Sequence, residues 1–323
     1  MTGFDVIAMG RLGVDLYPLQ VGVALPDVES FGKFLGGSAA NVAVAAARYG
    51  RRVALISRTG ADPFGAYLHR ELRGYRVDDR YVSGVPGLPT PVTFCEIRPP
   101  DDFPLYFYRY PKAPDLEIRP EELDLAAIAD AALFWVTGTG LSAQPSRAAH
   151  RAALRYRAGT GRTVLDLDYR PAFWPSREAA RDALAEVLPS VDVAVGNLDE
   201  CLTAVGTADP DAAADALLAR GVELAVVKRG SAGVLARTAN EEVSLAPIPV
   251  EVVNGLGAGD AFGGALCHGL LAGWPLDRTL RFANAAGALV AGRLACAPDM
   301  PTATEVEALL ARRADPDGVG RRG

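Results

Sequence analysis

Strand-like and helical segments alternate regularly through the second half of the chain, and this alternation limits the fold more than any other feature. The apolar, strand-like segments are residues 132–137, 163–168, 191–196 and 223–227, and the connections between elements are short. Consecutive strands linked by helices pair in parallel, because each helix returns the chain to the starting edge of the sheet. The pattern therefore predicts an α/β fold with a mostly parallel central sheet that helices cover on both faces.

Two segments in the first part of the chain do not follow this alternation. Residues 12–34 and 90–112 contain short extended runs without helical periodicity, and the second segment is rich in aromatic residues. We expect these runs to form a small β-sheet that acts as a lid over a site on the core. Residues 1–11, 35–89 and 113–323 would then form the core, since 323 residues are enough for a large α/β unit with such an addition.

The glycine-rich turn at residues 254–260 has the composition of an anion-binding site. Its glycines at positions 257 and 259 leave backbone N–H groups uncovered, and the helix that follows presents its unpaired N–H groups at the same point. Asp260 lies in the first turn of that helix. Its carboxylate would either cap the helix or accept a proton from a hydroxyl that attacks a phosphoryl group. The local sequence leaves both interpretations open.

Polar residues and glycines also lie at the ends of other predicted strands and at the starts of the helices that follow. They are Asp15, Gly36, Gly37, Asn41, Asp166, Asp168, Asn197, Glu200 and Lys228. Because parallel strands end at one edge of the sheet, we expect these residues to gather there and bind a ligand. Each has a plainer interpretation as well, such as a turn residue for Asp15, a helix cap for Asn197 or a strand-end ion pair for Lys228.

Local signals predict where two helices in the first part of the chain begin. Ser38 is expected to be the N-cap of one helix, and Asp62 with Pro63 is expected to open the next. The buried stripe of this second helix is predicted, from helical spacing, to consist of Phe64, Tyr67, Leu68 and Leu72. His69 falls outside that stripe and is expected to face solvent.

Composition and motif spacing exclude several classes of protein. The net charge of −6 has the wrong sign for a protein that binds the phosphate backbone of nucleic acid, and the four cysteines and three histidines show no metal-ligand spacing. No Walker sequence occurs, and Gly255-x-Gly257-x-Gly259 lacks the spacing of a dinucleotide fingerprint. Without a signal peptide or a run of about 20 apolar residues, we expect a cytoplasmic protein with no membrane partner and no nucleic-acid partner.

The segments around Asp260 and Asn41 resemble the two signatures of the ribokinase-like (PfkB) carbohydrate kinases. Gly257-Ala258-Gly259-Asp260-Ala261-Phe262 is similar to the C-terminal signature, and Gly36-Gly37-Ser38-Ala39-Ala40-Asn41 is similar to the N-terminal one. The resemblance implies that Asp260 is the catalytic base. It also implies that the anion hole consists of Gly257, Ala258 and Gly259. The chain departs from the family at Asn254-Gly255, where most members have Asp-Thr, so contacts of those two residues are not carried over.

The same resemblance implies a kinase that uses ATP and Mg²⁺, with a ribokinase-like fold, and it assigns roles to the residues at the strand ends. Sugar hydroxyls would be held by Asp15, Gly36, Gly37 and Asn41. The nucleotide would lie against Asn197, Lys228, Gly230, Gly233 and Asn284. Glu200 would act on Mg²⁺ through water.

Longer segments resemble one branch of this family, the 5-dehydro-2-deoxygluconokinases of inositol catabolism. They are residues 87–96, 107–115, 166–171 and 254–260. The resemblance implies ATP-dependent phosphorylation of the 6-hydroxyl of 5-dehydro-2-deoxygluconate. The carboxylate of such a sugar acid requires an arginine or a lysine. The candidates are Lys33, Arg109, Lys112 and Arg170, and the sequence does not rank them.

Three alternatives stay open beside this interpretation. The same machinery would serve a 2-dehydro-3-deoxygluconate kinase or a sugar kinase of the ribokinase or fructokinase type. A non-catalytic sugar- or nucleotide-binding protein is disfavoured, because binding alone would gain nothing from the carboxylate of Asp260 beside a phosphate.

The aromatic lid would also offer a surface through which two copies of the chain could form a homodimer.

Overall fold

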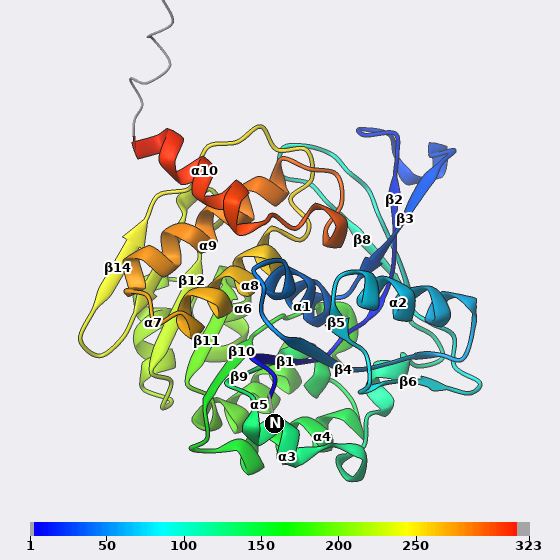
Figure 1. Ribbon diagram of the computed structural model, residues 1–323, viewed down its shortest axis with the longest axis horizontal. Helices are drawn as coiled ribbons and strands as arrows, with labels where there is room; N and C mark the ends of the chain where they lie inside the picture. The colour runs from blue at the N-terminus through cyan, green and yellow to red at the C-terminus, as the bar shows by residue number, and fades with distance from the viewer. Residues whose placement is uncertain (1–2, 315–323) are drawn as a thin grey trace, which may run out of the picture.

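The computed structural model describes residues 3–314, which form a large sheet, a small sheet and helices around them (Figure 1). The ten described strands of the large sheet are β1 (Val6–Met9), β4 (Val53–Gly60), β5 (Val77–Asp78), β6 (Val82–Val85), β9 (Leu133–Thr137), β10 (Arg162–Asp166), β11 (Val193–Asn197), β12 (Leu224–Lys228), β13 (Val234–Arg237) and β14 (Glu242–Leu245). Their order is β14-β13-β12-β11-β10-β9-β1-β4-β5, and β6 pairs with β4. All neighbours pair in parallel except at β13 and β14, which confirms the predicted α/β class.

Helices cover both faces of this sheet because each central strand is apolar on both sides. In β1, Val6 and Ala8 belong to one hydrophobic core, whereas Ile7 and Met9 belong to the other. The first core receives side chains from α1 (Ser38–Arg48), α2 (Pro63–Gly74), α8 (Ala258–Leu271) and α9 (Leu276–Ala291), with α10 (Ala303–Ala314) beside α9. The second receives side chains from α3 (Leu125–Asp130), α4 (Ser146–Arg157), α5 (Arg177–Val187), α6 (Leu198–Val205) and α7 (Pro210–Leu218).

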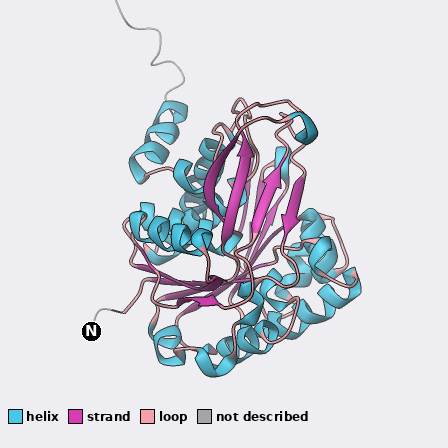
Figure 2. Ribbon diagram, turned by 90° about the vertical axis from the view of Figure 1, so that its right-hand side faces the viewer, coloured by secondary structure: helices cyan, strands magenta, loops and turns pink. Residues whose placement is uncertain are grey.

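The small sheet stands apart from the large one (Figure 2). Its strands are β2 (Gly13–Pro18), β3 (Phe31–Gly36), β7 (Val92–Cys95) and β8 (Leu105–Tyr108), in the order β3-β2-β7-β8. One side of it is anchored in the core through Tyr17, Leu35 and Cys95, which are all buried. The side chains of Tyr106 and Tyr108 on β8 are exposed. The two-sheet arrangement agrees with the predicted fold class.

Two local predictions were wrong, those for Ser38 and Phe64. Ser38 is the first residue of α1 and not its N-cap, because Gly37 takes that position with a φ of 99° and the Ser38 hydroxyl donates to Asp168 instead. Phe64 is 39% exposed, and its ring lies near the ammonium group of Lys33 in the lid and not in the core. His69 lies outside the buried stripe as predicted, and its partly exposed ring is hydrogen-bonded to Asp79.

Asp62 opens α2 as predicted, and its carboxylate accepts a hydrogen bond from the backbone N–H of Gly65. The rest of the predicted stripe, Tyr67, Leu68 and Leu72, is buried.

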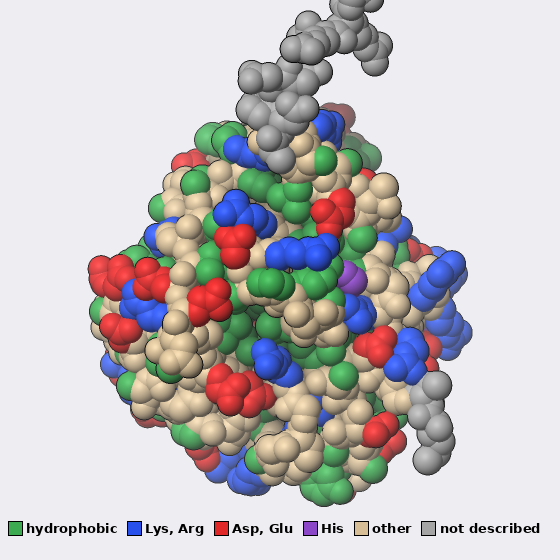
Figure 3. Space-filling view, turned by 60° about the vertical axis from the view of Figure 1, so that its left-hand side comes forward, with side chains coloured by type: hydrophobic (Ala, Val, Ile, Leu, Met, Phe, Trp, Pro, Cys, Tyr) green, Lys and Arg blue, Asp and Glu red, His purple; other side chains and the backbone are tan. Residues whose placement is uncertain are grey.

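The surface carries acidic and basic side chains interspersed with hydrophobic ones on the face shown in Figure 3. Among the helices of residues 3–314, none combines the length and the apolar character needed to cross a bilayer. The cytoplasmic location and the absence of a nucleic-acid partner stay predictions.

Candidate active site

A pocket of about 80 Å³ lies where the small sheet meets the loops at the carboxyl ends of β1 and β10. It is lined by Arg11, Asp15, Tyr17, Gly37, Ser38, Asn41, Thr93, Leu105, Phe107, Arg170, Leu256, Gly257, Asp260 and Cys296. Six of the residues predicted to act in the site meet here, and they are Asp15, Gly37, Asn41, Arg170, Gly257 and Asp260. They come together because parallel strands deliver their following loops to one edge of the sheet.

Asn254 holds the glycine-rich turn in shape. Its side-chain oxygen accepts a hydrogen bond of 3.0 Å from the backbone N–H of Leu256, and its amide donates one of 2.8 Å to the carbonyl of Leu294. Gly255 is needed next to it, because a Cβ at that position would lie 2.8 Å from the ring of Phe103 in the lid. The departure from the family at these two positions therefore has a structural role in this chain.

The first N–H groups of α8 are open to a ligand. Gly257 precedes the helix with a φ of 80°, and the N–H of Ala261 is the first to donate within the helix, to the carbonyl of Gly257. The N–H groups of residues 258–260 have no acceptor among the described residues, and no side chain caps the helix. Such a group of donors at a helix N-terminus is suited to an anion.

Lys228 adds a positive charge beside these donors. A Cβ on Gly259 would lie 3.4 Å from the Lys228 Nζ, so the ammonium group reaches the start of α8. Burial would lower the pKa of Lys228, but the negative charges of Asp166, Glu200 and Asp260 outweigh that effect and raise it. The predicted strand-end ion pair is not formed, because no carboxylate among residues 3–314 lies within 4.0 Å of the ammonium group.

The carboxylate of Asp260 is half-buried and does not cap the helix. Burial raises the pKa of its carboxyl group to about 6, and a hydrogen bond of 2.8 Å from the side-chain amide of Asn41 acts in the opposite direction. The side-chain oxygen of Asn41 is buried and has no partner among the described residues, so it offers an acceptor to a ligand. A carboxylate with a pKa near 6 can accept a proton at neutral pH.

Asp15 is held by Tyr17 and by close contact with Gly36. Burial raises the pKa of Asp15 to about 7, although the Tyr17 hydroxyl donates a hydrogen bond of 3.0 Å to it. A Cβ on Gly36 would lie 2.1 Å from the Asp15 carboxyl carbon, and one on Gly37 would lie 2.5 Å from the carbonyl oxygen of Arg11. Both glycines are therefore required by the close approach of their neighbours.

Tyr17 also connects the lid to the turn at Gly257. Its hydroxyl oxygen lies 2.9 Å from the Sγ of Cys296. Either the Tyr17 hydroxyl or the Cys296 thiol can be the donor in this second contact. Cys296 packs against the turn so closely that a Cβ on Gly257 would lie 2.4 Å from its Sγ. The sequence analysis did not identify Tyr17 or Cys296, since neither lies in a recognisable motif.

Arg11 and Asp168 form an ion pair at the base of the pocket. The Nη2 of Arg11 lies 3.0 Å from the Asp168 Oδ2, and the hydroxyls of Ser38 and Thr139 each donate a hydrogen bond of 2.8 Å to the same carboxylate oxygen. Burial alone would raise the pKa of Asp168, but Arg11, Arg170 and these hydroxyls lower it to about 2. Sequence reasoning missed Arg11, although it lies in the short connection between β1 and β2, four residues before Asp15.

Arg170 bridges the site to α6. It lies 3.1 Å from the Asp168 carboxylate and 3.2 Å from that of Glu200. Asn197 is the N-cap of α6, because its side chain accepts from the N–H of Glu200 and the Glu200 carboxylate accepts from the N–H of Asn197. The helix-cap interpretation of Asn197 is thus realised in the structure, and both oxygens of Glu200 already have protein partners.

Lys33, Arg109 and Lys112 do not line this pocket. The Lys33 ammonium lies 3.9 Å from the centre of the Tyr67 ring. The Arg109 guanidinium is paired with Asp115 at 2.8 Å. Lys112 pairs with Glu117 and donates a hydrogen bond of 2.7 Å to the Gln144 carbonyl.

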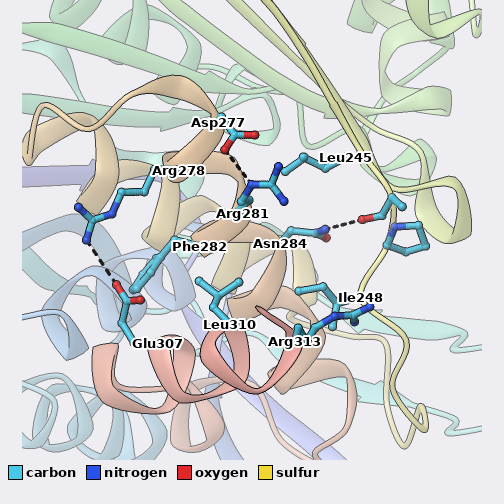
Figure 4. A pocket seen from close by; sticks show the side chains of 12 residues that line it. Leu245, Ile248, Asp277, Arg278, Arg281, Phe282, Asn284, Glu307, Leu310 and Arg313 are labelled. Carbon is cyan, nitrogen blue, oxygen red and sulfur yellow. Dashed lines mark hydrogen bonds and ion pairs between the residues drawn. The ribbon is translucent and has the colours of Figure 1, made fainter. Parts of the chain in front are cut away.

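The residues predicted to bind the nucleotide lie at the neighbouring strand ends and on α9. Gly230 and Gly233 form the turn after β12, with φ values of 56° and 88°. Asn284 lines a larger pocket of about 660 Å³ between α9, α10 and the segment after β14 (Figure 4). Its side-chain amide donates a hydrogen bond of 2.8 Å to the carbonyl of Ala246, which fixes its orientation at the wall of that pocket.

The sequence model of the pfkB family of carbohydrate kinases matches residues 4–303. A 5-dehydro-2-deoxygluconokinase of Shouchella clausii is 32% identical over 312 residues, which cover 95% of each chain, and one of Photobacterium profundum is 35% identical over 310 residues, which cover 92% of each. The crystal structure of a protein described as a ribokinase II of E. coli, in complex with ATP and Mg²⁺, superimposes with a TM-score of 0.86 at 27% identity and covers 96% of this chain and 99% of that one. The ribokinase-like fold predicted from the sequence is thereby confirmed.

Proposed function

Because the chain belongs to the pfkB family of carbohydrate kinases, we propose that it transfers the γ-phosphoryl group of ATP to the 6-hydroxyl of 5-dehydro-2-deoxygluconate. The observation that carries this proposal is the position of Asp260, a half-buried carboxylate in a pocket beside the unpaired N–H groups of α8. The acceptor is the one named in the similar proteins of Shouchella clausii and Photobacterium profundum, and the arginines in the pocket suit its carboxylate.

In the proposed reaction, Asp260 accepts the proton of the attacking hydroxyl. The hydroxyl oxygen forms a bond to the γ-phosphorus, the bond from that phosphorus to the β-phosphate oxygen breaks, and ADP leaves. Asp260 has a pKa of about 6 and is therefore mostly ionised at neutral pH, so it is ready to accept the proton. Its position in the first turn of α8 and its hydrogen bond from Asn41 support this role.

The N–H groups of residues 258–260 would bind the oxygens of the transferring phosphoryl group. They are fixed in direction by the helix, so little reorganisation is needed when negative charge develops on those oxygens. Lys228 would neutralise part of the same charge from beside Gly259. The pKa of Lys228 is raised by the neighbouring carboxylates, so the ammonium group stays charged, as this role requires.

The hydroxyls of the acceptor would be held by Asp15 and Asn41. The free side-chain oxygen of Asn41 accepts a hydrogen bond from a hydroxyl, and the carboxyl group of Asp15 faces the same pocket. Gly36 and Gly37 would let the acceptor lie against the backbone. Arg170, whose side chain lines the pocket, stays a candidate for contact with the acceptor.

The nucleotide would lie on the side of Lys228, Gly230, Gly233 and Asn284. Among residues 3–314, no cluster of three or more acidic, cysteine or histidine side chains forms a metal site, and both oxygens of Glu200 have protein partners. These observations fit Mg²⁺ held chiefly by ATP oxygens and water, which Glu200 would contact through a water molecule near Asn197. When bound, the metal would neutralise charge on the phosphates.

A homodimer through the lid is the other part of the proposal. Tyr108 and Tyr110 are 62% and 81% exposed on the lid, which is unusual for large aromatic side chains. Light scattering during gel filtration would measure the mass of the particle. A mass of one chain, at concentrations used for the kinase assay, would reject the dimer without affecting the proposed reaction.

The proposed reaction is tested by measuring ADP release with Mg²⁺, ATP and four acceptors, which are 5-dehydro-2-deoxygluconate, 2-dehydro-3-deoxygluconate, fructose and ribose. We expect kcat/KM to be highest for the first by at least about 100-fold, and phosphorus NMR to show a phosphate ester at the 6-position. A preference for fructose or ribose would replace the acceptor and keep the kinase. A lack of turnover with every acceptor would contradict the proposal of catalysis on any of them.

A further inference from the structure

Arg11 is the one arginine at the pocket whose terminal guanidinium nitrogens are not all engaged by the described residues. Its side chain is 9% exposed and lines the pocket. The Nε donates to the Thr139 hydroxyl at 3.2 Å, and the Nη2 donates to Ser38 at 3.0 Å and to the Asp168 carboxylate. The Nη1, with two N–H donors, has no acceptor within residues 3–314. The Nη1 is not among the buried atoms that lack a partner, and Arg11 lines the pocket, so its two N–H donors are open to a ligand acceptor.

The hydrogen bonds around Arg11 fix its guanidinium before any ligand arrives. Ser38 and Thr139 each accept a hydrogen bond from Arg11 and donate one to Asp168, so the network is closed. The rings of Phe107 and Phe173 lie near the guanidinium, with centres 6.0 and 5.6 Å from its carbon. A donor held in this way loses little conformational entropy when it binds an anion.

The other basic residues proposed as carboxylate ligands have less to offer. In Arg170, the Nη1 donates to the Tyr169 carbonyl and to Glu200, and the Nη2 is paired with Asp168. Lys33, Arg109 and Lys112 lie outside the pocket and have partners of their own. Arg11 therefore combines a position in the pocket, a fixed orientation and two open donors.

We propose that the Nη1 of Arg11 binds the carboxylate of the acceptor and makes the enzyme selective for sugar acids over neutral sugars. This inference rests on the proposed phosphoryl transfer at Asp260. Asp260 would contact the 6-hydroxyl of the acceptor, and Arg11 would bind the C1 carboxylate at the other end of the carbon chain. An acceptor with a neutral C1 group leaves these donors without a charged partner, which weakens its transition state relative to that of the acid. Phe107 belongs to β8, so the lid covers the end of the acceptor that Arg11 holds.

The test compares 5-dehydro-2-deoxygluconate with its analogue in which the C1 carboxylate is replaced by CH₂OH. For the unaltered enzyme we expect kcat/KM to favour the acid by about 100-fold or more. The double substitution R11Q/D168N removes both charges of the pair and leaves neutral groups of similar shape. In this variant we expect the preference to fall below about fivefold, chiefly through a higher KM for the acid. Turnover of the neutral analogue shows that the variant is folded.

The matched comparison is R109Q/D115N, which removes an equivalent arginine–aspartate pair from outside the pocket. We expect it to keep the preference for the acid. The single variant R11K, which keeps the charge but presents it from one nitrogen, should show a preference between those of the unaltered enzyme and R11Q/D168N. If R11Q/D168N also loses turnover of the neutral analogue, two further measurements still test the inference. They are the preference of R11K for the acid and the effect of the acid on the Tm of R11Q/D168N.

The outcomes separate this inference from the proposed function. If the unaltered enzyme prefers the acid and R11Q/D168N keeps that preference, Arg11 is not the carboxylate ligand and the proposed function stands. The same conclusion follows if R11K keeps the full preference and the acid raises the Tm of R11Q/D168N as much as that of the unaltered enzyme. If the unaltered enzyme shows no preference for the acid, the proposed function fails on that measurement alone, and this inference fails with it.

Discussion

The side-chain amide of Asn41 donates a hydrogen bond of 2.8 Å to the carboxylate of Asp260, although 219 residues separate them in the sequence. The contact joins the first turn of α1 to the first turn of α8, two helices that pack together on the same face of the sheet. It stabilises the ionised form of a carboxylate that burial pushes toward the protonated form. The state of the proposed base therefore depends on a residue of the N-terminal signature.

Replacing Asn41 by Ala should move the acid limb of the pH–rate profile to higher pH. Asp260 must be ionised to accept a proton, so activity falls as the pH drops through its pKa, which is about 6. Removing the hydrogen bond favours the protonated form and raises that pKa, so the limb should move by about one pH unit. The measurement is kcat/KM between pH 5 and 9, with the exposed Asn240→Ala as control. An acid limb at the same pH in both variants would contradict the link between Asn41 and Asp260.

Replacing Asp260 by Asn should reduce kcat by about 10³-fold while ATP still binds. The substitution keeps the size of the side chain and its contact with Asn41 but removes the group that accepts the proton. Isothermal titration would measure the affinity for ATP, and ADP release would measure turnover. Asp211→Asn is a suitable control, because Asp211 is an exposed carboxylate on α7 in an ion pair with Arg237. Turnover of the Asp260 variant within about tenfold of the unaltered enzyme would reject Asp260 as the base.

Gly257→Ala and Gly259→Ala should differ sharply, although both change the proposed anion hole. Gly257 has a φ of 80°, and a Cβ there would lie 2.4 Å from the Sγ of Cys296. Gly259 is an ordinary helical residue whose Cβ would meet only the flexible end of Lys228, at 3.4 Å. We expect Gly257→Ala to lower kcat/KM by at least about 100-fold and the free energy of unfolding by ~2 kcal/mol. Gly259→Ala should lower kcat/KM by less than about tenfold without loss of stability.

Equal losses in the two glycine variants would show that the backbone conformation at Gly257 is not the important feature. Chemical denaturation would measure stability, and ADP release would measure activity. A large loss of kcat/KM in Gly259→Ala alone would instead show that the space between Gly259 and the Lys228 ammonium group is needed for activity.

The pocket residues that could be predicted from the sequence are those that follow parallel strands or lie in the first turns of helices. Asp15, Asn41 and Asp260 meet because strand order and sheet direction determine where their loops lie. The positions of Gly37 and Gly257 could also be predicted from the sequence, because few residues other than glycine adopt the positive φ found at these helix starts. These features follow from local rules together with the alternation of strands and helices.

Pairing between charged side chains could not be read in the same way. Arg109 faces Asp115 and Lys33 packs on Tyr67, and neither contact follows from hydrophobic periodicity or from strand order. Arg11 was overlooked because its partner, Asp168, lies 157 residues further along the chain. The left-handed backbone of Asp168, with a φ of 33°, is also invisible in a sequence without glycine at that position.

The last prediction concerns Asp166, which is 4% exposed at the end of β10. Burial, together with the charges of Glu200 and Asp168, outweighs the attraction of Lys228 and raises the pKa of Asp166 to about 7, against about 3.9 in an unfolded chain. A group whose pKa is higher in the folded state stabilises the fold at low pH, and that contribution is lost as the pH rises through the folded pKa. Asn at this position stays neutral at every pH and can still accept the hydrogen bond from the Asp168 N–H.

The Tm of Asp166→Asn, relative to that of the unaltered protein, should therefore increase between pH 5.5 and pH 8.5. We expect a relative increase of about 3 °C, because the unaltered protein must hold an additional buried charge at the higher pH. Differential scanning calorimetry at both pH values, without nucleotide, measures the difference. Asp211→Asn on the surface should show no such change, since Asp211 is exposed. A relative Tm that is constant or decreases with pH would mean that Asp166 is already ionised at pH 5.5, held in that form by Lys228.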